Sequence, residues 1–131
     1  MKKIIYVLLT LVTQAYAQNS YLCIPDGTTG FAMNAKSQTW EIAPFNTSGN
    51  KMVLKKSSNS WIWSSFGSSS GLTCNKDFDE NGNLSCQTVL GELKFNKKSL
   101  RYMETSTVGY YQGDKAVERN PFISIGRCSP L

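Results

Sequence analysis

The sequence contains no histidine, and this absence removes several classes of function. Ser-His-Asp and Cys-His nucleophilic catalysis both need an imidazole as general base. The four cysteines include no Cys-x-x-Cys pair, and without histidine a zinc site has too few of its usual ligands. The sequence therefore predicts neither a histidine-dependent enzyme nor a zinc protein, and we expect no cofactor.

Long apolar runs are absent beyond the first residues, so the sequence predicts no transmembrane segment after residue 17. The chain starts with Lys2 and Lys3, followed by the apolar stretch IIYVLLTLVT and the small-residue motif Ala15-Tyr16-Ala17. This order is typical of a cleaved signal peptide covering residues 1–17. The residues before Cys23 do not form a lipid-attachment motif. We therefore expect an exported protein, either periplasmic or secreted.

Charge is scarce and only weakly one-sided. The chain holds 14 basic and 9 acidic residues, and removal of residues 1–17 would take away Lys2 and Lys3, which leaves a net charge of +3. This small surplus is compatible with an anionic envelope component as partner. Export, and the lack of a recognition helix or an RNP-type strand, argue against nucleic acid. Residues 18–131 have the length of one domain with a modest core.

The four cysteines are most simply explained as two disulfides of a small exported domain. Three pairings are open, and we favour the nested one, in which Cys74 bonds to Cys86 and Cys23 bonds to Cys128. The first bond would clamp a hairpin, and the second would tie the two ends of the domain together. In the loop-entropy model these closures stabilise the fold by about 3 and about 4.7 kcal/mol respectively.

Alternation of apolar and polar residues is common, whereas helical periodicity is hard to find beyond the N-terminal segment. The clearest alternating segments are residues 40–43, 91–96, 99–104 and 122–128. Alternation predicts half-buried strands, with Leu93 and Phe95, and likewise Ile123 and Ile125, facing the core.

Strand-like segments recur about every ten residues between Gly-, Asn-, Ser- and Pro-rich turns. This spacing predicts an all-β fold, either a small antiparallel β-barrel or a sandwich, and a lipocalin-like meander is favoured. Pairing of Cys23 with Cys128 would make the first and last strands neighbours. Closing a meander into a barrel requires that arrangement.

The segment between the two central cysteines contains the most site-like pattern of the chain. Asp77, Asp79 and Asn81-Gly82 follow the spacing of an EF-type calcium loop, but the position that needs a bidentate glutamate is Thr88. Asn81-Gly82 is instead typical of a tight hairpin turn. We predict a turn with solvated aspartates and no metal, and a weak calcium site over residues 77–83 is the alternative.

The candidate binding residues are aromatic and basic. Trp61 and Trp63 share one strand face, opposite Ile62, so one of two apolar faces is available for a partner, although core packing alone is favoured. A basic rim surrounds the FNKKSLR turn, where a solvated hairpin tip is the simpler interpretation, and it comprises Lys94, Lys97, Lys98 and Arg101.

Carboxylates are the remaining candidates for acid–base chemistry. Those considered are Asp26, Glu41, Glu92 and Glu104. None of the four lies in a recognisable catalytic motif, and solvation at the surface is the commoner role of such residues. We therefore expect a protein that is not an enzyme.

Several motifs resemble those of one protein family. The chain contains CIPDGTTGF at residues 23–31, FNKKSLRY at 95–102, Gly109-Tyr110, and IGRCSPL at 125–131. With these motifs it resembles a family of small exported proteins of proteobacteria and their prophages. The resemblance covers nearly all of residues 18–131. It implies an extracytoplasmic location and paired cysteines, and it carries over no activity and no catalytic residue.

A more distant similarity is to periplasmic lysozyme inhibitors, which are small disulfide-closed barrels. Their Tyr-x-Cys near the mature start corresponds to Tyr21–Cys23, and Cys128 matches their late cysteine. The inhibitory loop motifs of that family are missing, and a net charge of +3 gives no steering toward basic lysozymes. We expect a non-enzymatic binding protein of the envelope, with an unknown envelope protein or an anionic component as partner. An inhibitor of a cell-wall hydrolase and a small-ligand-binding barrel are the alternatives.

Overall fold

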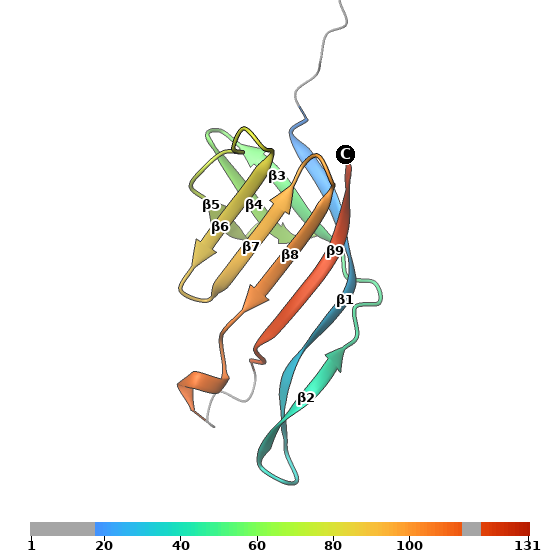
Figure 1. Cartoon of the computed structure of the whole chain (residues 1–131), viewed down its shortest axis with the longest axis vertical. Coiled ribbons are helices and arrows are strands. Elements are labelled where there is room, and N and C mark those ends of the chain that lie inside the picture. Colours follow the sequence, from blue (N-terminus) through green and yellow to red (C-terminus); the bar gives the residue numbers. More distant parts are fainter. Residues whose placement is uncertain (1–17, 114–118) are drawn as a thin grey trace, which may run out of the picture.

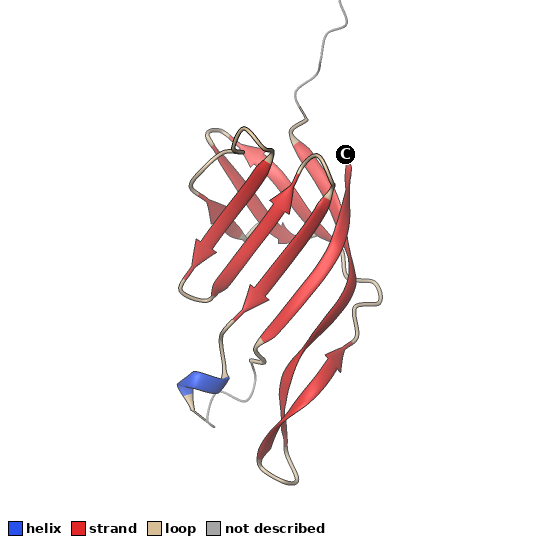
Figure 2. Ribbon diagram, viewed as in Figure 1, coloured by secondary structure: helices blue, strands red, loops and turns tan. Residues whose placement is uncertain are grey.

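The computed structural model describes residues 18–113 and 119–131, and the predicted signal peptide lies outside these residues. Within them, nine strands form one antiparallel sheet that rolls into a nearly closed barrel (Figures 1 and 2), which confirms the all-β prediction. The elements are β1 (Ser20–Asn34), β2 (Thr39–Phe45), β3 (Met52–Ser57), β4 (Ser60–Ser65), β5 (Leu72–Cys74), β6 (Asn83–Thr88), β7 (Gly91–Asn96), β8 (Arg101–Ser106), the short 3-10 helix η1 (Tyr110–Gln112) and β9 (Phe122–Pro130). None of the described helices is long and apolar enough to cross a membrane.

The strand order is that of a meander, except that β2 lies outside the main strand order and forms a hairpin with β1. Around the barrel the neighbours are β5, β4, β3, β1, β9, β8, β7 and β6, while β2 pairs with β1 alone. Strand β1 is long enough to serve two partners on one side, because residues 20–23 pair with β3 and residues 28–34 pair with β2. On its other side β1 pairs with β9. The first and last strands are therefore neighbours, as predicted.

Both predicted disulfides are confirmed, and they have different roles. Cys23 and Cys128 are direct cross-strand partners in the β1–β9 ladder. Cys74 and Cys86 lie on β5 and β6, the two strands at which the hydrogen-bonded sheet ends. The expectation that the Cys74–Cys86 bond clamps a hairpin is therefore wrong, because no ladder joins β5 to β6. The bond instead closes the seam of the barrel.

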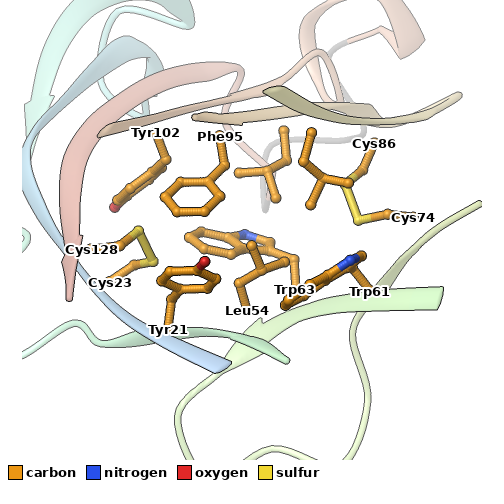
Figure 3. Packing of buried hydrophobic residues seen from close by; sticks show 12 residues of the cluster. Tyr21, Cys23, Leu54, Trp61, Trp63, Cys74, Cys86, Phe95, Tyr102 and Cys128 are labelled. Carbon is orange, nitrogen blue, oxygen red and sulfur yellow. A yellow bond between two sulfur atoms is a disulfide. The ribbon is translucent and has the colours of Figure 1, made fainter. Parts of the chain in front are cut away.

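Aromatic side chains fill the interior between the two disulfides. Figure 3 shows Tyr21, Trp61, Trp63, Phe95 and Tyr102 converging from strands on opposite sides of the barrel. The rings of Tyr21 and Phe95 pack edge-on at 4.9 Å, and those of Trp63 and Tyr102 lie 5.0 Å apart. Full burial of a large apolar side chain contributes about 1.5–3 kcal/mol. This part of the barrel is consequently a packed core.

The inward face of β7 agrees with the sequence, but that of β9 does not. Ile123 and Ile125 are 42% and 54% exposed, whereas Ser124 is buried. The disulfide holds Cys128 toward the core, and the period of two then turns Ser124 and Gly126 inward as well. A Cβ at Gly126 would lie 2.4 Å from a backbone oxygen of β1, so only glycine fits there. The disulfide thus overrides the apolar alternation of this strand.

The two ends of the barrel differ. The loop of residues 75–82, which we call the plug, folds over one end of the barrel beside the turn of residues 96–100 (Figure 1). We call this end the plugged end. At the opposite, open end the rim is formed by residues 46–51, 66–71, 88–91, 107–113 and 119–121. The hairpin of β1 and β2 projects beyond this open end.

Candidate functional site

The segment that resembles an EF-type calcium loop, residues 77–83, forms most of the plug of the barrel. The Phe78 ring packs edge-on against Trp61 at 5.0 Å and against Phe95 at 5.9 Å. The Asp77 carboxylate accepts hydrogen bonds from Nζ of Lys56 and from Nε1 of Trp61, each at 2.8 Å. These two donors and the Phe78 backbone N–H hold the pKa of Asp77 well below its usual range. The plug is therefore anchored to the core through both its phenylalanine and its first aspartate.

The second aspartate closes a turn. Asp79 accepts hydrogen bonds from the backbone N–H of Asn83 at 2.7 Å and from its Nδ2 at 3.1 Å, and these bonds lower the pKa of Asp79. The N–H of Gly82 donates to the carbonyl oxygen of Asp79 at 3.0 Å, and Gly82 has a φ of 83°. A turn therefore forms at residues 79–82, but it is not the predicted hairpin turn, because the flanking strands β5 and β6 do not pair. Asp77 and Asp79 are both exposed, as the prediction of solvated aspartates requires, and each also accepts hydrogen bonds from neighbouring groups of the protein.

Metal-ligating side chains do not cluster within residues 18–113 and 119–131. No group of three cysteine, aspartate or glutamate side chains there lies close enough together to hold an ion. At the plug, the protein's own donors already occupy the carboxylate oxygens of both aspartates. The plug therefore has a structural explanation that requires no ion.

The four residues of the predicted basic rim occupy two kinds of position. The Lys97 ammonium lies 5.0 Å over the Phe78 ring, and Lys98 Nζ donates to a backbone carbonyl of the plug at 3.4 Å. These two lysines therefore cover the plug. Lys94 and Arg101 lie on exposed positions of β7 and β8.

Trp61 and Trp63 belong to the core, so their assignment to a binding surface is wrong. They are 2% and 3% exposed. Strand β4 lies between β3 and β5, and its inward face meets the rings of Tyr21 and Tyr102. The core-packing interpretation of the Trp-x-Trp pattern is confirmed, and a binding surface has to come from other residues.

The four candidate carboxylates divide into three on the surface and one in the interior. The three have partners: Asp26 with Arg127 at 2.8 Å, Glu41 with Asn34 at 3.0 Å, and Glu92 with Ser85 at 3.0 Å. Glu104 is different, because it lies opposite Ser124 and Leu93 on the inward side of β8. Glu104 lines both of the cavities at the open end of the barrel, whereas Glu92 lines only the larger one.

Two cavities meet at the open end of the barrel. Their volumes are about 410 and about 740 Å³, and both are lined by Glu104 and Phe122. The smaller one, which we call the carboxylate cavity, presents more apolar than polar surface but has several polar side chains among its lining residues. Its other lining residues are Pro25, Thr28, Phe45, Asn46, Thr47, Asn50, Met52, Tyr102, Asn120 and Ser124.

Burial controls the electrostatics of the carboxylate cavity. It raises the pKa of Glu104, and the indole N–H of Trp63 opposes this effect. Burial likewise raises the pKa of Tyr102 to about 12, with a smaller opposing effect from Ser124. Thr28 Oγ1 donates to Ser124 Oγ at 2.8 Å. The cavity thus gathers hydroxyl groups around a carboxyl group that has lost part of its hydration.

The projecting hairpin carries an exposed apolar face. The β1–β2 register pairs Phe31 with Ile42 and Met33 with Trp40 on one side of the hairpin. Phe31 is 48% and Ile42 is 79% exposed. Alternation in β2 predicted that Trp40 and Ile42 face the core. This prediction is wrong for Ile42, because the hairpin extends beyond the barrel and no described layer covers it.

A groove of about 790 Å³ lies beside this apolar face. Trp40 and Tyr110 line it with their rings in a T-shaped contact at 5.6 Å. We call it the aromatic groove, and its full lining is Phe31, Thr39, Trp40, Ser106, Thr107, Tyr110, Tyr111 and Pro121. The sequence analysis did not predict this site. The adjacent tyrosines Tyr110 and Tyr111 were the signal in the sequence, and both are exposed in the structure.

The architecture defines the class of the protein as a small β-barrel domain closed by two disulfides. In comparisons with known proteins, no protein-family model, no curated sequence and no solved structure matches the chain. The resemblance to small exported proteobacterial proteins therefore stays a prediction. The aromatic groove and the carboxylate cavity are the two candidate binding sites of the described structure.

Proposed function

We propose that the protein is exported and acts as a non-enzymatic binding protein of the cell envelope, which takes up an extended segment of a partner protein along β2. The exposed apolar face of the projecting hairpin, with Phe31 and Ile42 at its centre, carries this proposal. Exposed apolar surface that is contiguous rather than scattered marks interaction sites. The two disulfides support export, because such bonds persist in oxidising compartments.

Strand β2 offers a free backbone edge for an added strand. It pairs with β1 on one side, and no other described strand pairs with it. Unpaired N–H and C=O groups on such an edge are a template for strand addition, in which main-chain hydrogen bonds supply affinity. Alternate side chains of the added strand would extend the face that carries Trp40 and Ile42. Specificity would come from the aromatic groove next to it.

A foreign segment fits this edge better than a second copy of β2 does. Antiparallel self-pairing centred on Ile42 brings both Pro44 residues into the ladder, and proline has no N–H to donate. Centring the pair on Glu41 avoids the prolines but places two carboxylates directly opposite each other, which is destabilising. A partner segment with apolar residues at alternate positions has neither problem.

The groove also favours a protein partner over an anionic envelope component. Its lining consists of aromatic, proline, serine and threonine side chains, with no lysine or arginine among the described lining residues. An anionic group would therefore find no counter-charge in the groove. Apolar and aromatic side chains of an extended peptide match this lining, because large aromatic surfaces dominate the affinity of such interfaces.

Site-specific photocrosslinking in cells that export the protein tests the proposal. A benzoylphenylalanine replaces Ile42 or Tyr111, and the same residue at Val89, which is 87% exposed on the β6–β7 turn, is the matched control. We expect one dominant protein adduct from positions 42 and 111 that is absent from position 89. Mass spectrometry should place the crosslink in an extended segment with alternating apolar residues.

A second variant separates specific docking from general stickiness. Ile42→Lys places a charge on the free edge, which blocks strand addition while leaving the exposed side chain free in solvent. It should remove the adduct formed at position 111. Equal adducts from all three positions, or crosslinked homodimers alone, would show that the hairpin does not take up a partner strand.

A further inference from the structure

The carboxylate cavity is separate from the proposed partner-binding face. Thr28 and Phe45, which line the cavity, are cross-strand partners. The period of two places them on the side of the hairpin sheet opposite Phe31 and Ile42. The cavity therefore opens into the barrel, and the aromatic groove lies outside it. A ligand in the cavity would leave the apolar face of the hairpin free.

Among the described lining residues of the carboxylate cavity, Glu104 is the only acidic one, and no described cation pairs with it. The described residues form three ion pairs, none of which includes Glu104, and no lysine or arginine is among the described lining residues. Burial of an unpaired carboxylate is costly unless a cation or hydrogen-bond donors compensate for the lost water. A cationic ligand would supply that compensation.

The indole N–H of Trp63 supports this reading of the cavity. Trp63 is 3% exposed, and its Nε1 is buried with no hydrogen-bond partner in good geometry. The N–H nevertheless favours the ionised form of Glu104, although burial has the larger and opposite effect on the pKa of this carboxyl. The Trp63 ring packs 5.0 Å from the ring of Tyr102, which lines the cavity, so Trp63 lies directly behind the cavity wall.

The rest of the cavity wall matches a primary ammonium group. Such a group donates three hydrogen bonds and accepts none. Besides Glu104, the oxygens of Thr28, Tyr102 and Ser124 are available as acceptors, and the side chains of Asn50 and Asn120 add amide oxygens. The aromatic side chains in the wall suit an alkyl chain and a nearby cation.

We propose that the carboxylate cavity binds a primary alkylammonium group, with Glu104 as its counter-ion and the hydroxyl groups of Thr28, Tyr102 and Ser124 around it. The volume of about 410 Å³ is in the range of small-molecule sites. The same chemistry occurs in free aliphatic amines and in the lysine side chain of a protein. The proposal concerns the ammonium site and does not depend on the partner segment at β2.

The test follows the indole N–H signals of the ¹⁵N-labelled protein by NMR. The protein is titrated with n-butylammonium chloride at constant ionic strength, and n-butanol, which has the same chain and no charge, is the matched control ligand. We expect a saturable shift of the Trp63 signal with the amine, because Trp63 packs against Tyr102, which lines the cavity. The signals of Trp40 and Trp61, which lie at the aromatic groove and the plug, should stay in place.

Two variants assign the charge dependence to Glu104. Glu104→Gln keeps the shape of the side chain and removes its charge, and it should weaken amine binding at least about tenfold. Glu80→Gln removes the same charge from the exposed plug and should leave binding unchanged. If Glu104→Gln fails to fold, the comparison of amine with butanol on the unmodified protein still decides the question.

A blocked Gly-Lys-Gly peptide distinguishes the two sources of the ammonium group. Binding of n-butylammonium without binding of the peptide supports the site and identifies its ligand as a free amine. Similar binding of both supports the site and extends it to lysine side chains. No saturable Trp63 shift, an equal shift with butanol, or unchanged affinity in Glu104→Gln would overturn the proposal.

Discussion

Burial of Glu104 links the stability of the barrel to pH. Desolvation raises the pKa of this carboxyl in the folded protein above its value of about 4.3 in an unfolded chain. The folded state therefore holds the proton more tightly, and this contribution to stability is complete below the unfolded pKa and lost as pH rises through the folded pKa. We expect Glu104→Gln to be more stable than the unmodified protein at pH 7 and to lose this advantage near pH 3.5, as measured by urea unfolding.

Asp77 gives the opposite sign and serves as the control for this measurement. Hydrogen bonds from Lys56 and Trp61 lower its pKa in the folded protein. Its contribution is therefore present above the unfolded pKa of about 3.9 and is lost as pH falls through the folded pKa. Asp77→Asn should be less stable than the unmodified protein at pH 7. Two carboxyl variants that shift stability in the same direction at pH 7 would contradict this account.

The plug shows how one element depends on a single backbone position. Gly82 has a φ of 83°, and a Cβ there would lie 3.1 Å from Cγ of Lys97. We expect Gly82→Val to lower the free energy of unfolding by about 1–2 kcal/mol. The loss should be equal in millimolar calcium and in chelator, because the carboxylate oxygens of the plug already accept hydrogen bonds within the protein.

Thermal unfolding of a second glycine variant provides the reference for the plug. A Cβ at Gly27 would meet nothing within 4 Å, so Gly27→Val should cost much less than Gly82→Val. A calcium-dependent rise in melting temperature that disappears in the Asp77→Asn/Asp79→Asn double variant would show that the plug is an ion site after all.

The sequence predicted the inward face of strands whose apolar side chains face the core and whose polar side chains face solvent. It did not predict the orientation of strands that contacts with distant residues determine. Alternation located β7 and its inward Leu93 and Phe95, because a half-buried strand imposes a period of two. The same rule failed for β9, where the bond to Cys128 sets which residues face inward. It also failed for Ile42, because alternation gives the two faces of a strand but does not say whether another layer covers either face.

The candidate sites were less predictable than the strands. Glu104 was one of several acidic residues without a motif, and its cavity is assembled from β1, β2, β3, β8, β9 and the rim of the open end. The anchoring of Asp77 depends on Lys56 and Trp61, which precede it by 21 and 16 positions. Such contacts follow from the closure of the barrel, which a local sequence pattern does not encode.

For the whole molecule, the two disulfides should differ in what their removal exposes. In the Cys74→Ala/Cys86→Ala variant the bond that holds the two unpaired edge strands β5 and β6 together is lost, so these edges can separate and pair with other chains. The loop-entropy model gives a loss of about 3 kcal/mol for this bond and about 4.7 kcal/mol for the Cys23–Cys128 bond. We expect the seam variant to self-associate more readily, even though its loss of stability is smaller.

Urea unfolding and light scattering on the two double variants test this separation. The Cys23→Ala/Cys128→Ala variant keeps the hydrogen-bonded β1–β9 ladder, so it should remain monomeric in native buffer while unfolding at a lower urea concentration. The same order in both measurements, with the less stable variant also the more associated one, would indicate that stability alone, rather than the open seam, controls association.

The Cys23–Cys128 bond also determines how the domain responds to tension. It joins residues 105 positions apart, on the neighbouring strands β1 and β9, close to residues 18 and 131. A pull applied at those two residues passes through the sulfur atoms and bypasses the barrel between them. The bond thereby prevents extension of the segment between Cys23 and Cys128, which would span about 350 Å when fully extended. Under traction in an envelope the domain would behave as a short, inextensible link, with its cavity and groove shielded from the load.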